Sequence, residues 1–208
     1  NLANTATENS SKVTPTQVAS TTATPTLTPT SEVVSVYVDP NLPAAFKDSL
    51  QLAAAGFVLA ESENVTAKLT FGSEDLISTW IYALVAPFPT VTDGIIAAEL
   101  QAFWQEASPT VYFDRLILGQ SSDKAIESLW GKPAGTVEVH ADTDLLDLAW
   151  NTPGTWAIIP FEEIQPRWKV IALDEQSPLH KDFIPESYSL TVPISLVAID
   201  GKPTDAIA

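Results

Sequence analysis

The apolar residues between positions 33 and 199 form short runs whose spacing alternates between strand and helix. Residues 33–38 are an apolar run of strand length, which Asp39 and Pro40 end. Apolar residues at 42, 46, 50, 53 and 54 then follow helical spacing, so a helix is predicted over 42–54. The folded part of the chain is therefore predicted to begin with a βα unit.

The run W-I-Y-A-L-V-A-P at 80–87 has the length and composition of a strand that is buried on both faces. Prolines at 87 and 89 end this strand. Thr90, Thr92 and Asp93 follow and offer N-cap chemistry to a helix predicted over 95–104. We therefore expect the strand to leave one packed unit and the helix to start another.

The same alternation continues to about position 160. Strands are predicted over 57–60, 67–71, 111–118, 136–140 and 156–160, and helices over 122–130 and 143–150. Beyond them, 168–173 and 188–199 are strand-like, and only a polar, proline-marked loop separates them. Alternating strands and helices favour parallel pairing with right-handed crossovers, which predicts an α/β fold.

Residues 1–31 are dominated by Thr, Ser, Ala, Asn and Pro. Such a segment cannot bury enough apolar area to offset its ordering entropy, so we interpret it as a disordered Thr/Pro-rich linker. It resembles the stalk that follows the lipid anchor or signal peptide of exported bacterial proteins. The sequence contains no methionine, and we therefore expect a mature or trimmed form of a longer product.

The net charge of -16 argues against nucleic acid or an anionic membrane surface as a partner, because both need a stripe of Lys and Arg. No apolar run reaches the roughly 18 residues of a membrane span, so no membrane insertion is expected. The absence of cysteine excludes disulfides, thiolate nucleophiles and Cys-ligated metals.

The sequence nominates no catalytic residue, metal or cofactor. His140 and His180 stand in no metal-binding or triad-like motif, and no nucleophile-elbow, Walker or dinucleotide glycine pattern occurs. Asp142, Asp144 and Asp147 lack the glycine and the further ligands of an EF-hand loop. The helix dipole stabilises carboxylates at a helix start, which explains Asp142 and Asp144 without a metal. Because no motif nominates a catalytic residue, the chain is expected not to be an enzyme.

Three segments resemble type 2 periplasmic binding proteins, the phosphate-binding ones especially. R-W-K-V-I-A-L-D-E-Q-S-P-L at 167–179 and Y-S-L-T-V-P-I-S-L-V at 188–197 are similar to the closing segment of that family. V-A-P-F-P-T at 85–90 resembles its first interlobe crossover, and G-Q-S-S-D-K-A-I-E-S-L-W-G at 119–131 its ligand-donating helix. Glu175 and Ser189 depart from the family, which often has Gly and Pro there.

This resemblance implies a two-lobed α/β fold in which each lobe is a small sheet flanked by helices. Lobe one is expected to comprise 32–92 plus 165–208, and lobe two 93–164. A ligand is then expected where strand ends and helix N-termini of the two lobes face each other. The predicted ligand-binding residues are Asp39, Asn41, Thr90, Thr92, Asp93, Gln120, Ser121 and Ser122.

For some of these residues, and for Arg115, a ligand-binding role and a purely structural role both stay open. Thr92, Ser121 and Ser122 also suit ordinary N-caps, each of which stabilises a helix by about 1 kcal/mol. Arg115 offers a positive charge to a carboxylate or phosphate, or is a surface residue of a strand edge.

Of the six tryptophans, Trp80 and Trp168 are expected to pack between the lobes, and the other four to seal the cores: Trp104, Trp130, Trp150 and Trp156.

A further resemblance concerns the N-terminal domain of bacterial poly-gamma-glutamate or capsule synthesis proteins, the CapA-like family. It is carried by Y-A-L-V-A-P-F-P-T-V-T-D-G, W-A-I-I-P-F-E-E-I-Q-P-R-W-K-V and D-E-Q-S-P-L. It implies an exported, surface-tethered, non-catalytic accessory or ligand-sensing module that precedes a phosphoesterase-like catalytic domain. The alternative is a free-standing ABC-transporter-type solute-binding lipoprotein for phosphate or another small polar ligand.

Overall fold

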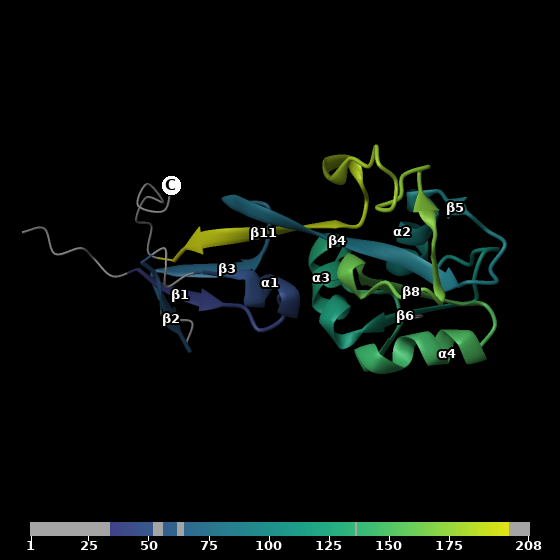
Figure 1. The fold of residues 1–208 in the computed structure, drawn as a ribbon, viewed down its shortest axis with the longest axis horizontal. Helices are drawn as coiled ribbons and strands as arrows, with labels where there is room; N and C mark the ends of the chain where they lie inside the picture. The colour runs from purple at the N-terminus through teal and green to yellow at the C-terminus, as the bar shows by residue number, and fades with distance from the viewer. Residues whose placement is uncertain (1–33, 52–55, 62–64, 136, 200–208) are drawn as a thin grey trace, which may run out of the picture. The chain divides into compact units, whose positions relative to one another are not determined.

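The computed structural model describes residues 34–51, 56–61, 65–135 and 137–199 (Figure 1). The chain separates into two units, 1–32 and 33–208, and every element below belongs to the second. The linker predicted at 1–31 and the end of the helix predicted over 42–54 lie outside the described residues.

Strands and helices alternate over residues 35–60 and 94–160, whereas four strands follow one another between residues 58 and 95. The strands are β1 (Ser35–Val38), β2 (Val58–Ala60), β3 (Ala67–Phe71), β4 (Leu76–Pro87), β5 (Gly94–Ile95), β6 (Arg115–Gly119), β7 (Val137–His140), β8 (Thr155–Pro160), β9 (Trp168–Val170), β10 (Ala172–Leu173) and β11 (Thr191–Ala198). The helices are α1 (Ala44–Ser49), α2 (Ala97–Glu106), α3 (Gln120–Trp130) and α4 (Leu145–Asn151), with short 3-10 turns η1 (Asp142–Asp144), η2 (Phe161–Glu163) and η3 (Pro185–Ser187).

Strand β4 belongs to two sections of one sheet (Figure 1). Its first half pairs with β11, which in turn pairs with β3, β1 and β2 in sheet section one. From Tyr82 onward β4 pairs with β8, which leads to β6 and β7 in sheet section two. The partner of β4 therefore changes between Ile81 and Tyr82, earlier in the chain than the crossover that the sequence suggests at 85–90.

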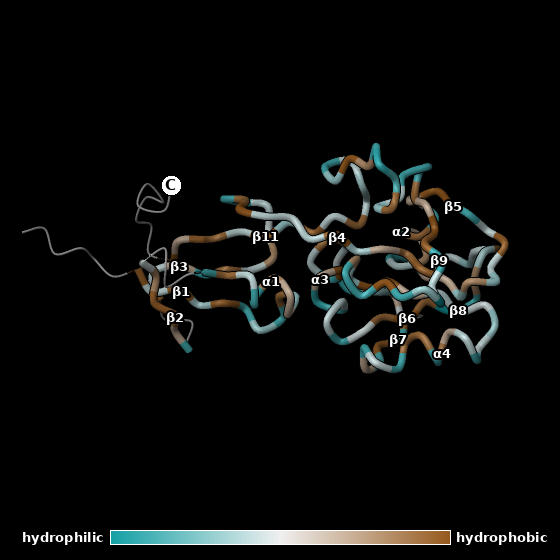
Figure 2. Tube along the Cα trace, in the orientation of Figure 1, coloured by the Kyte–Doolittle hydropathy of each residue, from teal (hydrophilic) through white to brown (hydrophobic). Residues whose placement is uncertain are grey.

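The second half of β4 is buried on both faces because helices cover both sides of sheet section two. Tyr82 and Leu84 join a core with residues of α2 and α3, whereas Ala83 and Val85 join a core with residues of α4. All six residues of β8 are buried as well. Figure 2 shows the hydrophobic character of these central strands.

A third core fills sheet section one, with Val36, Phe46 and Leu69 among its members. Phe71 and Trp80 pack against both this core and the core under α2 and α3. The ring of Trp80 lies edge-on to that of Phe46, with ring centroids 5.7 Å apart. Trp80 therefore links the two sections, as predicted, whereas Trp168 packs in the core that includes residues of α4.

The helix starts differ from the predicted caps. Ile96 is the N-cap of α2, because the short strand β5 intervenes after Asp93, and the amide of Ala97 donates to the carboxylate of Asp174 instead. Gly119, which has no side chain, is the N-cap of α3, and the backbone N–H of Ser121 in its first turn donates to the carboxylate of Asp142. The capping roles predicted for Thr92, Ser121 and Ser122 are therefore wrong.

Candidate functional site

Three parallel strands end at one edge of sheet section two, which we call the carboxyl edge. Strand β6 pairs in parallel with β7 and with β8, so Gly119, His140 and Pro160 end their strands on the same side. Helix α3 and the turns η1 and η2 begin directly beyond these strand ends. The carboxyl edge of parallel strands is where open α/β sheets bind ligands.

The first turn of α3 contributes Gln120, Ser121 and Ser122. The backbone N–H and the hydroxyl of Ser121 both donate to Oδ1 of Asp142, at 3.3 and 2.7 Å. The side chain of Ser122 is fully buried, and its hydroxyl has no hydrogen-bond partner in the part of the chain that the structure describes. Gln120 is exposed at the helix start.

Three carboxylates gather at the carboxyl edge, and we call Asp142, Glu162 and Glu163 the acidic cluster. They line a pocket of about 380 Å³ together with Thr143, Ile164 and Gln165. Trp80 positions one of them, because its indole N–H donates to Oε1 of Glu162 over 2.9 Å. The acidic cluster therefore lies beside the point where β4 passes between the two sheet sections.

The hydroxyl of Tyr82 is buried near the same carboxylates. The side chain is fully buried, and its hydroxyl has no hydrogen-bond partner among the described residues. Burial raises the pKa of Tyr82, and the negative charges of Glu162, Glu163 and Asp142 raise it further. The phenol thus stays protonated and lies within electrostatic reach of the acidic cluster.

The acidic cluster predicts how stability depends on pH. Partial burial raises the pKa of Glu163, although the side chain keeps contact with solvent, and the charges of Asp142 and Glu162 raise it further. The folded state then holds a proton that the unfolded state has released, so stability should increase as the pH falls from neutral into the titration range of Glu163. Melting temperatures measured from pH 7.5 downward should show this gain, and Glu163→Gln should reduce it.

A gain of the same size in Glu163→Gln would contradict this origin. Glu99→Gln is the matched control, because Glu99 is exposed in the first turn of α2 and outside the acidic cluster.

In sheet section one, Asp39 and Asn41 form a turn directly after β1. Oδ1 of Asp39 accepts from the backbone N–H and the side-chain amide of Asn41, at 2.9 and 2.8 Å, and Oδ2 accepts from the hydroxyl of Thr70. The ammonium group of Lys47 donates to the carbonyl of Pro40 in the same turn. These contacts give Asp39 a structural role whether or not a ligand binds.

Thr90, Thr92 and Asp93 lie at the opposite end of sheet section two from Ser121. Strand β4 is antiparallel to β8, so Tyr82 faces Pro160 at the end of β8, and later residues of β4 face earlier residues of β8, as Val85 faces Ala157. Pro87 follows Tyr82 by five residue steps along the strand, which corresponds to about 17 Å. Lys169 fixes this segment, because its ammonium group binds the carbonyls of Thr90 and Val91 and the carboxylate of Asp93. The structure does not bring these residues together with Ser121 and Ser122.

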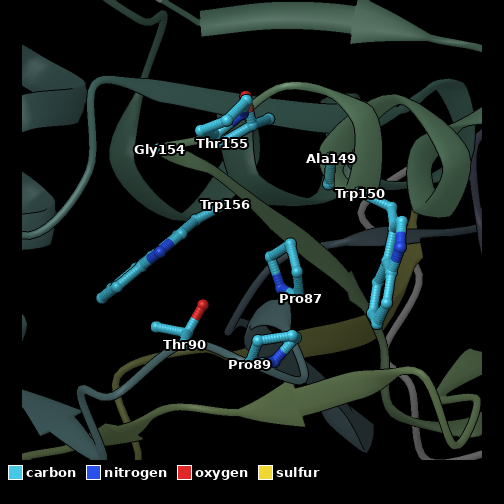
Figure 3. Close-up of a pocket in the computed structure, with 9 residues that line it drawn as sticks. Pro87, Pro89, Thr90, Ala149, Trp150, Gly154, Thr155 and Trp156 are labelled. Carbon is cyan, nitrogen blue, oxygen red and sulfur yellow. The ribbon is translucent and has the colours of Figure 1, made fainter.

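A second pocket, of about 350 Å³, lies at that opposite end and includes Thr90. In Figure 3 the rings of Trp156 and Trp150 stand on either side of Pro87. The pocket lining is mainly proline and tryptophan, and it includes Thr155, whose buried hydroxyl has no partner in the described structure. No charged side chain lines this pocket.

Other candidates from the sequence fall outside the carboxyl edge. Arg115 starts β6 at its far end and pairs with Glu138 at 3.4 Å. Among the described residues, no group of three or more His, Asp or Glu side chains is arranged to hold a metal ion. None of the described helices is both long enough and apolar enough to cross a membrane.

Sequence reasoning selected the first turn of α3 but missed the acidic cluster, Trp80 and Tyr82 as site residues. The sequence does contain a pattern that indicates these carboxylates. A-D-T-D comes directly after the strand at 137–140, and F-E-E comes directly after the strand at 155–160, so acidic residues follow both strands. The rule that ligands lie beyond the carboxyl ends of parallel strands applies equally to these segments.

Comparisons with known proteins bear on the fold. No protein-family model and no curated protein sequence matches the chain. The chain is similar in structure to an ABC-type phosphate transport receptor from Vibrio cholerae, with a TM-score of 0.59 and 11% identity over 84% of this chain and 90% of that one. It is also similar to PstS from Borrelia burgdorferi, with a TM-score of 0.57 and 9% identity over 84% and 90% of the two chains.

At identities this low, structural similarity establishes the fold and leaves the ligand open. Both similar proteins are matched over nearly their whole length, so the likeness includes both sheet sections and the strand that joins them. The chain therefore has the α/β fold of type 2 periplasmic binding proteins, as its sequence resemblance predicts.

Proposed function

We propose that this chain is an exported, non-catalytic solute-binding module, and that its solute binds at the carboxyl edge of sheet section two. The proteins of similar structure include an ABC-type phosphate transport receptor, which favours the solute receptor over an enzyme. This site would use the first turn of α3, the acidic cluster and the region around Tyr82. Asp39 and Asn41, at the end of β1, are the candidates from sheet section one.

The observation that carries this proposal is the buried hydroxyl of Ser122. A buried hydroxyl without a partner costs about 1–3 kcal/mol, and folded proteins rarely leave such groups unpaired without a reason. Ser122 lies in the first turn of α3, at the end of the strand where ligands bind in folds of this class. A solute that hydrogen-bonds this hydroxyl would remove the cost of leaving it unpaired.

The accessory role in capsule or poly-gamma-glutamate synthesis is the less favoured proposal. It rests on sequence phrases that in this chain include β4, β8, η2 and β9, and such segments of the sheet and its edge do not distinguish an accessory module from a receptor. The two roles differ in one measurable respect: a receptor binds its solute as an isolated chain.

The test measures binding and stability of Ser122→Ala together. The unliganded variant should unfold with unchanged free energy, or with a gain of up to about 1–2 kcal/mol, because an unpaired hydroxyl has been removed. Its affinity for the solute should fall about tenfold, which corresponds to one hydrogen bond of about 1.4 kcal/mol. A thermal screen of the full chain against phosphate, amino acids, sugars and amines identifies the solute, since a ligand at 100 times its Kd adds about 2.7 kcal/mol.

Ser128→Ala is the matched control in the same helix. Its hydroxyl donates to the carbonyl of Ala125 at 2.6 Å and lies away from the first turn of α3, so solute affinity should not change. A Ser122→Ala variant that loses stability and keeps full affinity would contradict the proposed site. A flat response of the wild-type chain to every class of solute would contradict the receptor role itself.

A further inference from the structure

We propose that the solute carries a positive charge, as an alkylammonium or guanidinium group, and that the carboxyl edge excludes phosphate-like anions. This inference rests on the proposed function, because it names the class of solute for the same site. It departs from what the similar phosphate receptors bind, and three features of this chain support it.

The first feature is that the protein's own carboxylate occupies the anion position at α3. Free backbone amides in the first turn of a helix bind anions such as phosphate. Here the amide and hydroxyl of Ser121 both donate to Asp142, at 3.3 and 2.7 Å. Gly119 permits this close approach, because a Cβ at this position would overlap the carboxylate of Asp142. An anionic solute would have to displace a carboxylate that is fixed to the chain.

The second feature is the sign of the charge in the pocket. Asp142, Glu162 and Glu163 all line it, and no Lys or Arg side chain is among its lining residues. The nearest basic residue in α3 is Lys124, which is bound to Asp123 and Glu127. The uncompensated carboxylates of such a pocket repel an anion and attract a cation.

The third feature is the pair of buried hydroxyl groups of Tyr82 and Ser122, neither of which has a hydrogen-bond partner within residues 34–51, 56–61, 65–135 and 137–199. Both side chains are fully buried, and the charges that act on the phenol of Tyr82 are those of the acidic cluster. An ammonium group has three donors and no acceptor, and it pairs with carboxylate and hydroxyl oxygens alike. The residues that line the pocket supply the carboxylate acceptors for such a group, and Tyr82 and Ser122 are not among the lining residues.

Four probes test the sign of the charge on the full chain. Putrescine, butane-1,4-diol and succinate share a four-carbon backbone and carry two positive charges, no charge and two negative charges, and inorganic phosphate is the fourth probe. We expect putrescine alone to raise the melting temperature and to give a saturable binding isotherm by calorimetry. Added sodium chloride should weaken this binding, because salt screens the attraction between charges at an exposed pocket.

Two variants connect putrescine binding to the acidic cluster. Glu162→Gln and Glu163→Gln should each weaken putrescine binding about tenfold, since a hydrogen bond to a charged group is worth at least about 1.4 kcal/mol. Glu99→Gln removes the same charge from the exposed first turn of α2 and should leave the affinity unchanged.

The outcomes separate this inference from the proposed function. Binding of phosphate or succinate in place of putrescine, with loss of affinity in Ser122→Ala, would overturn the cationic solute and retain the receptor. Equal binding of putrescine by the wild type and both glutamine variants, or equal binding of putrescine and butanediol, would also overturn it. The absence of binding by any solute in the wider thermal screen would overturn both.

Discussion

Trp104→Ala should lower the free energy of unfolding by about 3–5 kcal/mol, the range measured for truncation of a large buried aromatic side chain. Trp104 is fully buried in the core under α2 and α3. Its ring packs edge-on against Trp130, with centroids 6.0 Å apart, and its indole N–H donates to the carbonyl of Gly131 at 2.8 Å. The substitution removes the ring contacts and the side-chain donor at once.

Equilibrium unfolding in urea measures this effect, and Trp150→Ala is the matched control. Trp150 is 40% exposed, and the guanidinium of Arg167 lies 4.7 Å from its ring centroid at the surface. Loss of an exposed cation–π contact costs about 0.5–1 kcal/mol, so this variant should unfold close to the wild type. If both variants lost a similar amount of unfolding free energy, the burial of each tryptophan would not determine its contribution to stability.

The same two residues show how far the sequence predicts the core. Helical spacing places Trp104 in line with Leu100, and Trp150 in line with Leu146, so both tryptophans are predicted to be buried. In the structure α4 ends at Asn151, and Trp150 stays 40% exposed beside Arg167. Periodicity indicates which side of a helix faces the core, but it does not tell where the covering layer ends.

The strands show a similar limit. The eight apolar residues at 80–87 were sufficient to predict a buried strand, but β4 begins at Leu76. Leu76 and Ile77 are about half exposed, and their place in the strand comes from pairing with β11, more than a hundred residues later. Pairing between segments so distant in sequence leaves no local pattern, so the point where β4 changes partner could not be read from the chain.

In the candidate site as well, some residues are marked by a local sequence pattern and others are brought together only by strand pairing. Serines after a strand and before a helix are visible locally, and Ser121 and Ser122 do lie at the carboxyl edge. The acidic cluster combines residues that follow β7 and β8, and only the parallel register of these strands with β6 brings them to one edge. Thr90 and Asp93 were predicted at the cleft because the crossover was placed at the end of β4, whereas the change of partner lies at Ile81–Tyr82.

Gly119→Ala should lower the free energy of unfolding by about 2–3 kcal/mol, although its backbone conformation suits alanine. Gly119 has φ -78° and ψ 157°, which any residue adopts, so the expected cost is steric. A Cβ at this position would overlap Oδ1 of Asp142 and lie 2.8 Å from its Cγ. The carboxylate would have to leave the first turn of α3 and lose both hydrogen bonds from Ser121, and hydrogen bonds to charged groups contribute about 1.5–3 kcal/mol each at most.

A double-mutant cycle with Asp142→Ala isolates this cause. If the overlap with Asp142 accounts for the loss, Gly119→Ala should cost less than about 0.5 kcal/mol once the carboxylate is absent, and the two substitutions should be clearly non-additive. Additive losses would instead show that the methyl group disturbs the end of β6 or the start of α3 by itself. Non-additivity would establish that the absence of a side chain at Gly119 leaves room for the carboxylate of Asp142 in the first turn of α3, where Ser121 binds it.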